Sequence, residues 1–122
     1  FEAGFVDPNE FPFTDSKLIN PHSFEHIDLP VVSGVTGNIS HGDEKSIIKI
    51  RNEFDPDIES MEGAAVFYVC LFEKVPFLEI RAISNYVELR DTEKWDIPGT
   101  LENLTDELFR FIRHYATVKQ LS

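Results

Sequence analysis

The fold of this chain is decided by residues 58–91, IESMEGAAVFYVCLFEKVPFLEIRAISNYVELRD. Every residue from 64 to 72 is apolar or aromatic, which predicts a helix that is buried on all sides, between a sheet and another layer. Pro76 interrupts this run, and residues 77–83 predict a short strand. A serine and an asparagine follow. The stretch therefore predicts an α/β unit with polar side chains at the carboxyl end of a strand, where open α/β sheets bind ligands.

Glu62 stands at the start of the expected helix and has two interpretations. As an acid in the first helical turn, it would simply interact favourably with the helix dipole. As a carboxylate at the mouth of a buried helix, it would face a pocket and accept two hydrogen bonds at once. A vicinal diol, such as the 2′ and 3′ hydroxyls of a ribose, supplies two such donors.

The composition indicates ordinary globular material, with 42% hydrophobic and 27% charged residues in a chain of 122. The net charge of −11 argues against nucleic acid and anionic membrane surfaces as partners, because binding to them requires an excess of Lys and Arg. No apolar run approaches the roughly 20 residues that span a bilayer. The single cysteine, Cys70, lies inside the apolar helix. A reduced thiol, no disulfide framework and a cytoplasmic location are therefore expected.

Further elements are expected on both sides of the central stretch. Residues 29–35 predict a buried strand that runs into Thr36, Gly37 and Asn38. Asp43 is placed to cap a helix over residues 44–53. The last helix begins near Asp96 and Pro98, with apolar residues at spacings of three and four, which is typical of an amphipathic helix laid on a sheet. These apolar residues are Leu101, Leu104, Leu108, Phe111, Ile112 and Tyr115.

Residues 22–26, HSFEH, match the H-x-x-E-H pattern of one group of zinc peptidases. On a helix, His22 and His26 would share one face, as zinc ligation requires. Pro21 and Pro30 leave room for barely two helical turns, however, and no third ligand is apparent in the sequence. The sequence therefore disfavours a zinc site, and we expect no bound metal.

Several motifs in this chain resemble the nucleoside phosphorylase and nucleosidase superfamily, and within it the futalosine hydrolase branch. They are SMEGAA at residues 60–65, VPF at 75–77, RAISN at 81–85, YVE at 86–88, RD at 90–91 and WDIP at 95–98. The resemblance runs from about Asp7 to the C-terminus. Each motif alone is weak, but the whole set with its spacing kept is specific to the family.

The resemblance implies an α/β fold, the C-terminal half of a three-layer α/β/α domain with a mixed central sheet. Members of the family begin with a strand and a Gly-rich loop that this sequence does not contain. We therefore expect residues 1–122 to be a single partial domain. The glutamate that activates water in the family is expected in the other half, so this chain alone is expected to be inactive or very weak.

By the same resemblance, Glu62 binds the two ribose hydroxyls and stabilises the oxocarbenium-like transition state. Met61 would give an apolar contact to the sugar, although core filling is the alternative for a methionine. Gly37 and Asn38 stand where the family often stacks an aromatic residue on the purine. Backbone contact with the base is therefore the expectation at these two positions.

Asn85 corresponds to the residue that holds the base, because its amide offers a donor and an acceptor to the O6 and N7 edge of a 6-oxopurine. Methylthioadenosine nucleosidases typically have an aspartate here, which can donate a proton to N7. Asparagine cannot act as a general acid in this way, which favours hypoxanthine-type substrates. Ser84 would support Asn85. The alternative is that Asn85 is only a turn residue at the end of a strand.

The sequence thus predicts a purine nucleosidase that hydrolyses the N-glycosidic bond of a 6-oxopurine nucleoside. The substrate implied by the resemblance is futalosine, with release of hypoxanthine, in menaquinone biosynthesis. No cofactor is expected. We expect the chain to form a homodimer or a higher homo-oligomer. A methylthioadenosine/S-adenosylhomocysteine nucleosidase and a purine nucleoside phosphorylase remain open within the family. Outside it, the alternative is a non-catalytic fragment that associates with itself through an uncovered apolar face.

Overall fold

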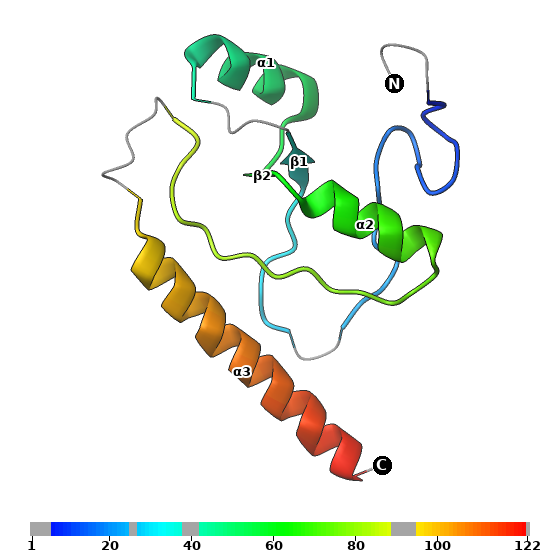
Figure 1. The fold of residues 1–122 in the computed structure, drawn as a ribbon, viewed down its shortest axis with the longest axis vertical. Helices are drawn as coiled ribbons and strands as arrows, with labels where there is room; N and C mark the ends of the chain where they lie inside the picture. Colours follow the sequence, from blue (N-terminus) through cyan, green and yellow to red (C-terminus); the bar gives the residue numbers. More distant parts are fainter. Residues whose placement is uncertain (1–5, 25–26, 38–41, 89–94, 122) are drawn as a thin grey trace. The chain divides into compact units, whose positions relative to one another are not determined.

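The computed structural model describes residues 6–24, 27–37, 42–88 and 95–121 (Figure 1). Its elements in chain order are β1 (Gly34–Thr36), α1 (Glu44–Phe54), β2 (Ile58–Ser60), α2 (Gly63–Phe72) and α3 (Ile97–Leu121). The chain divides into two compact units, one made of Phe1–Ser40 and Ile48–Glu79, the other of His41–Ile47 and Ile80–Ser122. Helices and a parallel sheet together give the α/β composition that the sequence predicts.

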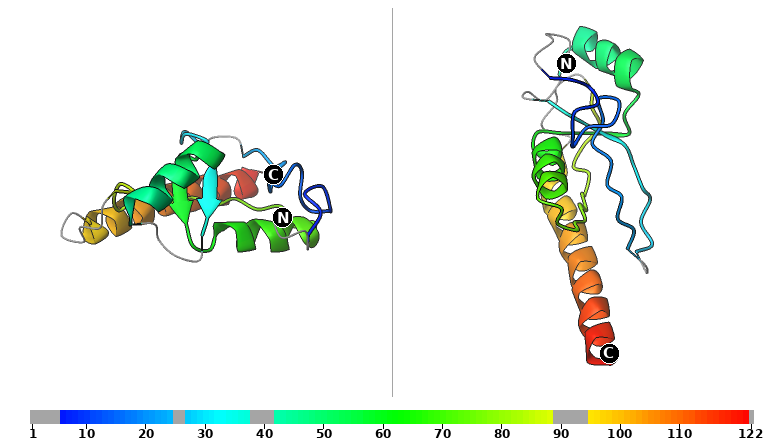
Figure 2. Two further views of the ribbon diagram at one scale, coloured as in Figure 1. Left: turned by 90° about the horizontal axis from the view of Figure 1, so that it is seen from above. Right: turned by 90° about the vertical axis from the view of Figure 1, so that its right-hand side faces the viewer.

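β1 and β2 form a two-stranded parallel sheet in the described part of the chain. The pairing runs from Gly34 opposite Ile58 to Thr36 opposite Ser60, and Figures 1 and 2 show the two strands side by side. Parallel neighbours need a crossover connection, which contains α1. The mixed sheet and the three layers expected from the family stay a prediction, because the described residues form these two strands alone.

Ser33 and Asp57 join the two chain segments just before the strands begin. The backbone N–H and the hydroxyl of Ser33 both donate to Oδ2 of Asp57, at 2.7 and 2.9 Å. The backbone N–H of Asp57 donates in turn to the Ser33 carbonyl at 3.0 Å. The backbone N–H of Ser33, followed by its hydroxyl, holds the pKa of Asp57 below its ordinary value of 3.8, because both groups stabilise the ionised form.

The predicted helix after Asp43 is confirmed as α1, one residue longer than expected. Oδ1 of Asp43 accepts a hydrogen bond from the backbone N–H of Ser46 at 3.0 Å, which is the capping contact that the sequence predicts. β1 overlaps the end of the predicted strand over residues 29–35 and extends it to Thr36. β1 is limited to three residues because the length of a strand is set by its pairing, and β2 pairs with β1 through three residues.

The prediction of a strand over residues 77–83 is wrong, since this segment belongs to neither strand of the sheet. The physical reason is that an extended segment becomes a strand only when its backbone groups pair with a neighbour. The β1–β2 pair does not include it. The polar residues Ser84 and Asn85 therefore follow an irregular segment.

α2 confirms the predicted helix but not its predicted burial. Within α2, Gly63 alone is classed as buried, whereas the side chains of Val66, Val69 and Phe72 are 43%, 58% and 52% exposed. A helix is enclosed only when layers cover it on opposite faces. The described part of this unit supplies a two-stranded sheet and a few aromatic contacts, which leaves one apolar side of α2 uncovered.

Aromatic side chains from other segments contact part of α2. Phe77, 8% exposed, meets the ring of Phe67 edge-on with centroids 4.8 Å apart. Phe11 contacts the ring of Phe72, with centroids 6.0 Å apart, and Phe13 contacts the ring of Tyr68, with centroids 5.7 Å apart. Residues 11–13 thus contact α2, and Phe77 is the buried hydrophobic side chain of the described residues.

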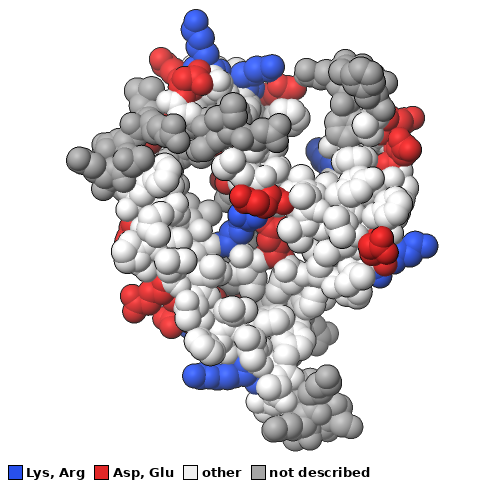
Figure 3. Space-filling model, viewed as in Figure 1, with Lys and Arg blue, Asp and Glu red and all other residues white. Residues whose placement is uncertain are grey.

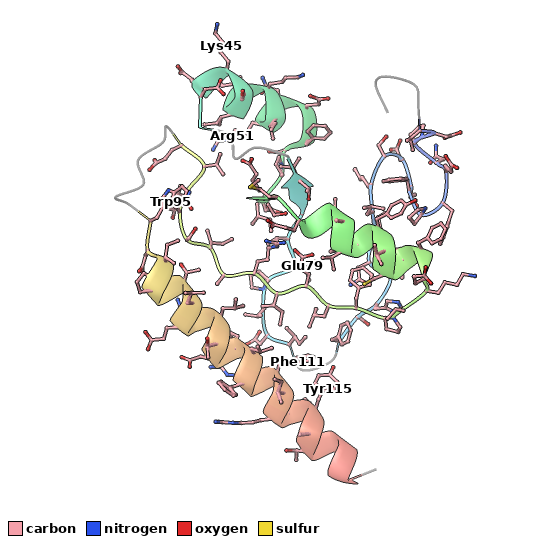
Figure 4. All side chains as sticks on the ribbon, in the orientation of Figure 1. Lys45, Arg51, Glu79, Trp95, Phe111 and Tyr115 are labelled. Atoms are coloured by element: carbon pink, nitrogen blue, oxygen red, sulfur yellow. The ribbon has the colours of Figure 1, made fainter. Side chains whose placement is uncertain are left out.

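In the second unit, α3 confirms the helix predicted after Asp96. Oδ1 of Asp96 caps it by accepting from the N–H of Gly99 at 3.0 Å. The rings of Phe111 and Tyr115 lie one turn apart on α3, with centroids 4.5 Å apart (Figure 4). The packing of this helix on a sheet stays a prediction. Among the described residues, no helix has the length and apolar character needed to cross a bilayer.

Candidate functional site

The candidate site is built at the edge where β1 and β2 end. Thr36 and Ser60 are the last residues of the two strands and are paired with each other. Their hydroxyl oxygens lie 3.4 Å apart. α2 begins three residues after Ser60, so the ends of both strands and the start of the helix meet at one place. This is the edge at which open α/β sheets bind ligands.

The two strand hydroxyls satisfy the first backbone N–H groups of α2. Oγ of Ser60 accepts from the N–H of Gly63 at 3.2 Å, and Oγ1 of Thr36 accepts from the N–H of Ala64 at 2.9 Å. These groups have no partner inside the helix and need one from outside. The helix start is thereby attached to both strands, and the capping oxygens come from residues other than the N-cap residue.

Glu62 occupies the N-cap position of α2, and its side chain makes no capping hydrogen bond. Its side chain is exposed, as is that of the preceding Met61, which is 52% exposed. The alternative interpretation, in which Glu62 only interacts with the helix dipole, requires no capping hydrogen bond and stays open. A carboxylate held at the end of two strands, with the capping done by hydroxyls, suits the recognition of an external donor pair.

Gly63 lies at the most crowded point of this edge. A Cβ atom at Gly63 would stand 2.8 Å from Oγ of Ser60, 3.2 Å from Oε1 of Glu79 and 3.4 Å from Oγ1 of Thr36. A glycine here lets the helix start approach these three polar side chains. Figure 4 labels Glu79, which belongs to the segment after α2 and reaches back to the start of that helix.

Ser84 and Asn85 belong to the second unit and form a local hydrogen-bonded pair. The Ser84 hydroxyl donates to Oδ1 of Asn85 at 2.6 Å, and Nδ2 of Asn85 donates to the Tyr86 carbonyl at 3.0 Å. The backbone N–H of Asp96 donates to the Ser84 carbonyl at 3.1 Å. The half-buried amide of Asn85 is thus held in one orientation, close to the start of α3.

The other predicted site residues fall partly at the same edge. The backbone N–H of Gly37 donates to the Ser60 carbonyl at 3.0 Å, which places Gly37 beside Glu62 at the end of the strands. Asn38 lies outside the described residues. Gly37, Met61 and Glu62 therefore share one edge of the first unit, while Ser84 and Asn85 make a separate pair in the second.

Three residues at this edge were not singled out by sequence reasoning: Thr36, Ser60 and Glu79. Ser60 carries a local signal, since a serine three residues before the first helical amide can accept its hydrogen bond. Thr36 and Glu79 carry no such signal. Thr36 is 28 residues from its partner Ala64, so only the folded chain brings them together.

The zinc pattern lies only partly within the described residues. The ring of His22 packs edge-on against Phe77, with centroids 6.4 Å apart, while residues 25 and 26 lie outside the described part. Across the residues that the structure describes, no three His, Cys, Asp or Glu side chains gather in a way that could hold a metal ion.

Comparison with known protein families identifies the phosphorylase superfamily. The sequence model of the phosphorylase superfamily matches residues 4–117. The predicted resemblance to this superfamily and its α/β class are confirmed by that match, which covers nearly the whole chain. No solved structure matches the chain at a significant level.

Three proteins with similar sequences are named for nucleosidase or hydrolase activities. A futalosine hydrolase of Acidothermus cellulolyticus is 35% identical over 109 residues, or 84% of this chain and 41% of that protein. An aminodeoxyfutalosine nucleosidase of Campylobacter jejuni is 39% identical over 87 residues, 67% of this chain and 38% of that protein. A 5′-methylthioadenosine/S-adenosylhomocysteine nucleosidase of Glaesserella parasuis is 25% identical over 125 residues, 95% of this chain and 54% of that protein. The chain thus spans about half the length of these relatives, or less.

Proposed function

This chain belongs to the phosphorylase superfamily, and from that premise we propose that it forms the ribose- and purine-binding part of a nucleosidase. The proposed reaction is hydrolysis of the N-glycosidic bond of a 6-oxopurine nucleoside, with futalosine as the substrate and hypoxanthine as the released base. Support for hydrolysis comes from relatives named as nucleosidases and futalosine hydrolases.

Glu62 is the residue that carries the proposal. Breaking the glycosidic bond develops positive charge on the ribose, and an ionised carboxylate close to the sugar stabilises that charge. Its two oxygens accept hydrogen bonds from the 2′ and 3′ hydroxyls. The observation in favour is that the hydroxyls of Thr36 and Ser60 cap α2, while the Glu62 side chain does not cap it.

Asn85 is proposed to hold the base. Its amide donates and accepts, which fits the O6 and N7 edge of a 6-oxopurine, and it cannot protonate N7 as an acid would. The Ser84 hydroxyl already fixes the orientation of this amide, at 2.6 Å from Oδ1. Met61 is proposed to contact the sugar, and Gly37 and Asn38 to contact the base through their backbone.

The base that activates water is proposed to come from polypeptide outside these 122 residues. Among the described residues, Glu79 is a second carboxylate at the Glu62 edge, and it lies against the first turn of α2. No metal or cofactor takes part in the proposed reaction. We expect the chain alone to release hypoxanthine from inosine no faster than a Glu62→Gln variant, and robust turnover by the chain would contradict this.

The proposed grip on the ribose is tested by binding, which requires no turnover. Titration calorimetry gives the affinity of the chain for three ligands. Inosine carries both the 2′ and the 3′ hydroxyl, 2′-deoxyinosine carries the 3′ hydroxyl without the 2′ hydroxyl, and hypoxanthine has no sugar. Glu62→Gln is expected to weaken inosine binding by about tenfold, the size of a charge-assisted hydrogen bond, and to leave hypoxanthine binding unchanged. Glu73→Gln, at the other end of α2, is the matched control. Equal inosine binding by the Glu62→Gln variant and the unsubstituted chain would refute the proposal.

A methylthioadenosine/S-adenosylhomocysteine nucleosidase is the second candidate, because relatives with that name match at 25% and 30% identity. The two candidate functions differ in the 6-substituent of the purine that they require. Asn85 favours a 6-oxopurine, so inosine is expected to bind more tightly than adenosine, and the opposite order would favour the second candidate. In a turning-over enzyme, formation of a sugar phosphate on addition of phosphate would indicate a phosphorylase instead.

Association of the chain with itself, as a homodimer or higher homo-oligomer, is proposed from the uncovered side of α2. Figure 3 shows that the surface formed by this helix is mostly uncharged, in agreement with the exposed side chains of Val66, Val69 and Phe72. Exposed apolar surface of this kind associates in water. A second copy presents the same side chains and is therefore a suitable partner. This proposal would also hold for a chain with no catalytic role.

A further inference from the structure

The inference concerns Glu79, which belongs to the segment that follows α2 and is assigned no role in the proposed reaction. Its Oε1 atom lies 3.2 Å from the position that a Cβ atom of Gly63 would take. Its Oε2 atom is buried. The carboxyl group of Glu79 thus has one buried oxygen and places the other at the first turn of α2, beside the hydroxyls of Ser60 and Thr36.

At the start of α2, the neighbouring sequence supplies one acidic residue, Glu62 at the N-cap position. α2 has no acidic residue in its first turn, and the Glu62 side chain does not cap it. The positive end of a helix dipole is stabilised by negative charge within about one turn. Glu79 brings such a charge to this point from a residue 16 positions beyond Gly63.

The segment that carries Glu79 is itself held in place. Phe77 is buried against Phe67, with ring centroids 4.8 Å apart. Nδ2 of Asn20 donates to the Phe77 carbonyl at 2.9 Å. These contacts fix the backbone two residues before Glu79, so its carboxylate is presented to α2 from a supported position.

We propose that Glu79 is a positioning residue, which holds the first turn of α2 and thereby sets the place of Glu62 for ribose binding. Glu62 directly precedes Gly63, so a shift of the first turn moves the Glu62 backbone with it. This inference rests on the proposed function, in which Glu62 binds the ribose. Glu79 itself touches no substrate.

The first test uses the free chain and NMR. Glu79→Gln removes the charge and keeps the size of the side chain, and it is expected to shift the backbone amide signals of Gly63 and Ala64. Glu73→Gln, which removes a charge at the opposite end of α2, is expected to leave those two signals in place. Unshifted Gly63 and Ala64 signals in the Glu79→Gln variant would overturn the inference.

The second test is a double-mutant cycle on binding. Glu79→Gln is expected to weaken inosine binding about two- to fivefold, the effect of one charge at a helix end, and to leave hypoxanthine binding unchanged. In a Glu62→Gln background it is expected to change nothing further, because it acts through Glu62. Gly63→Ala, whose Cβ would stand 2.8 Å from Oγ of Ser60 and 3.2 Å from Oε1 of Glu79, crowds the same turn and is expected to weaken inosine binding as well.

The outcomes separate the two claims. If Glu62→Gln weakens inosine binding but Glu79→Gln does not, or if the two effects add fully, Glu79 does not position Glu62 and only this inference is wrong. A loss of hypoxanthine binding in the Glu79→Gln variant would indicate a general structural role and overturn it too. If Glu62→Gln leaves inosine binding unchanged, the proposed function is wrong and the role of Glu79 in ribose binding fails with it.

Discussion

The carboxylates of this chain differ in the hydrogen-bond donors that contact them. Asp43, Asp57 and Asp96 each accept from one or more backbone N–H groups, which ties them to the start of a helix or to a neighbouring segment. Glu62 stands at a helix start as well, yet its side chain is not used for capping. The N–H groups of Gly63 and Ala64 donate instead to the hydroxyls of Ser60 and Thr36. At the scale of single residues, this is what makes Glu62 a candidate for binding a ligand.

Asp57 gives a pH-dependent prediction. The backbone N–H and the hydroxyl of Ser33 lower the pKa of Asp57 below 3.8, its ordinary value, by stabilising the charged form. The stabilisation from this group is therefore fully present above pH 3.8, its value in the unfolded chain, and is lost as the pH falls through the lower pKa of the folded chain. A titration followed at the Asp57 carboxyl carbon by NMR measures that midpoint.

Ser33→Ala is the informative variant for this prediction. It removes the hydroxyl that donates at 2.9 Å and keeps the backbone donor at 2.7 Å. The pKa of Asp57 is expected to rise toward 3.8 without reaching it, because the larger cause of the shift, the backbone hydrogen bond, remains. A midpoint at or above 3.8 in the unsubstituted chain would contradict the assignment.

At the scale of elements, α2 is set by both local and distant contacts. Its end is local: the N–H of Val75 donates to the Cys70 carbonyl at 2.9 Å, and Lys74 adopts a φ of 55°. This arrangement closes a helix C-terminus, so α2 ends before Pro76 is reached. Its start depends on Thr36, which reaches it from β1, so the helix start and the strand ends form one structural unit.

The two capping hydroxyls are expected to contribute measurably to stability. Thr36→Val and Ser60→Ala each remove one acceptor from the first amides of α2 and are expected to lower the free energy of unfolding by about 1 kcal/mol. Urea denaturation followed by circular dichroism gives this value. Thr105→Val is the control, because Oγ1 of Thr105 donates to the Leu101 carbonyl within exposed helix and caps nothing. A smaller loss for Thr36→Val than for Thr105→Val would refute the capping role.

At the scale of the whole molecule, uncovered apolar surface is the main feature. In a single-domain protein, a helix as apolar as α2 is normally enclosed. Here Val69 is 58% exposed, and other apolar side chains of α2 are exposed near it. The relatives are about twice as long or longer. The apolar sequence of α2 predicts a buried helix. A layer from a second copy or from further polypeptide would bury the apolar side chains of α2 that are exposed here.

Self-association is expected to depend on α2. Val69→Lys places a charge in the middle of the uncovered side and is expected to shift the chain toward the monomer, as measured by light scattering coupled to gel filtration. Val31→Lys is the matched control, because Val31 is 100% exposed and lies outside α2. An unsubstituted chain that remains monomeric at all concentrations would contradict the proposal, as would equal effects of the two substitutions.

The sequence by itself determined the elements whose signals are local. Asp43 predicted the start of α1, the apolar run predicted α2, and the spacing of apolar residues after Asp96 predicted α3, since each helix is specified by its own residues. The motifs around Glu62 and Asn85 likewise indicated the family, which the match over residues 4–117 confirmed.

Only the tertiary structure decided what depends on a partner distant in the chain. Residues 77–83 had a suitable composition for a strand, but pairing determines a strand and the sheet consists of β1 and β2 in the described part. The side chains of α2 were apolar enough for a core, but the layers around them determine burial. Thr36 meets Ala64 across 28 residues of sequence, and Glu79 meets Gly63 across 16. Such contacts carry no local signature, because their energy is gained only after the chain has folded.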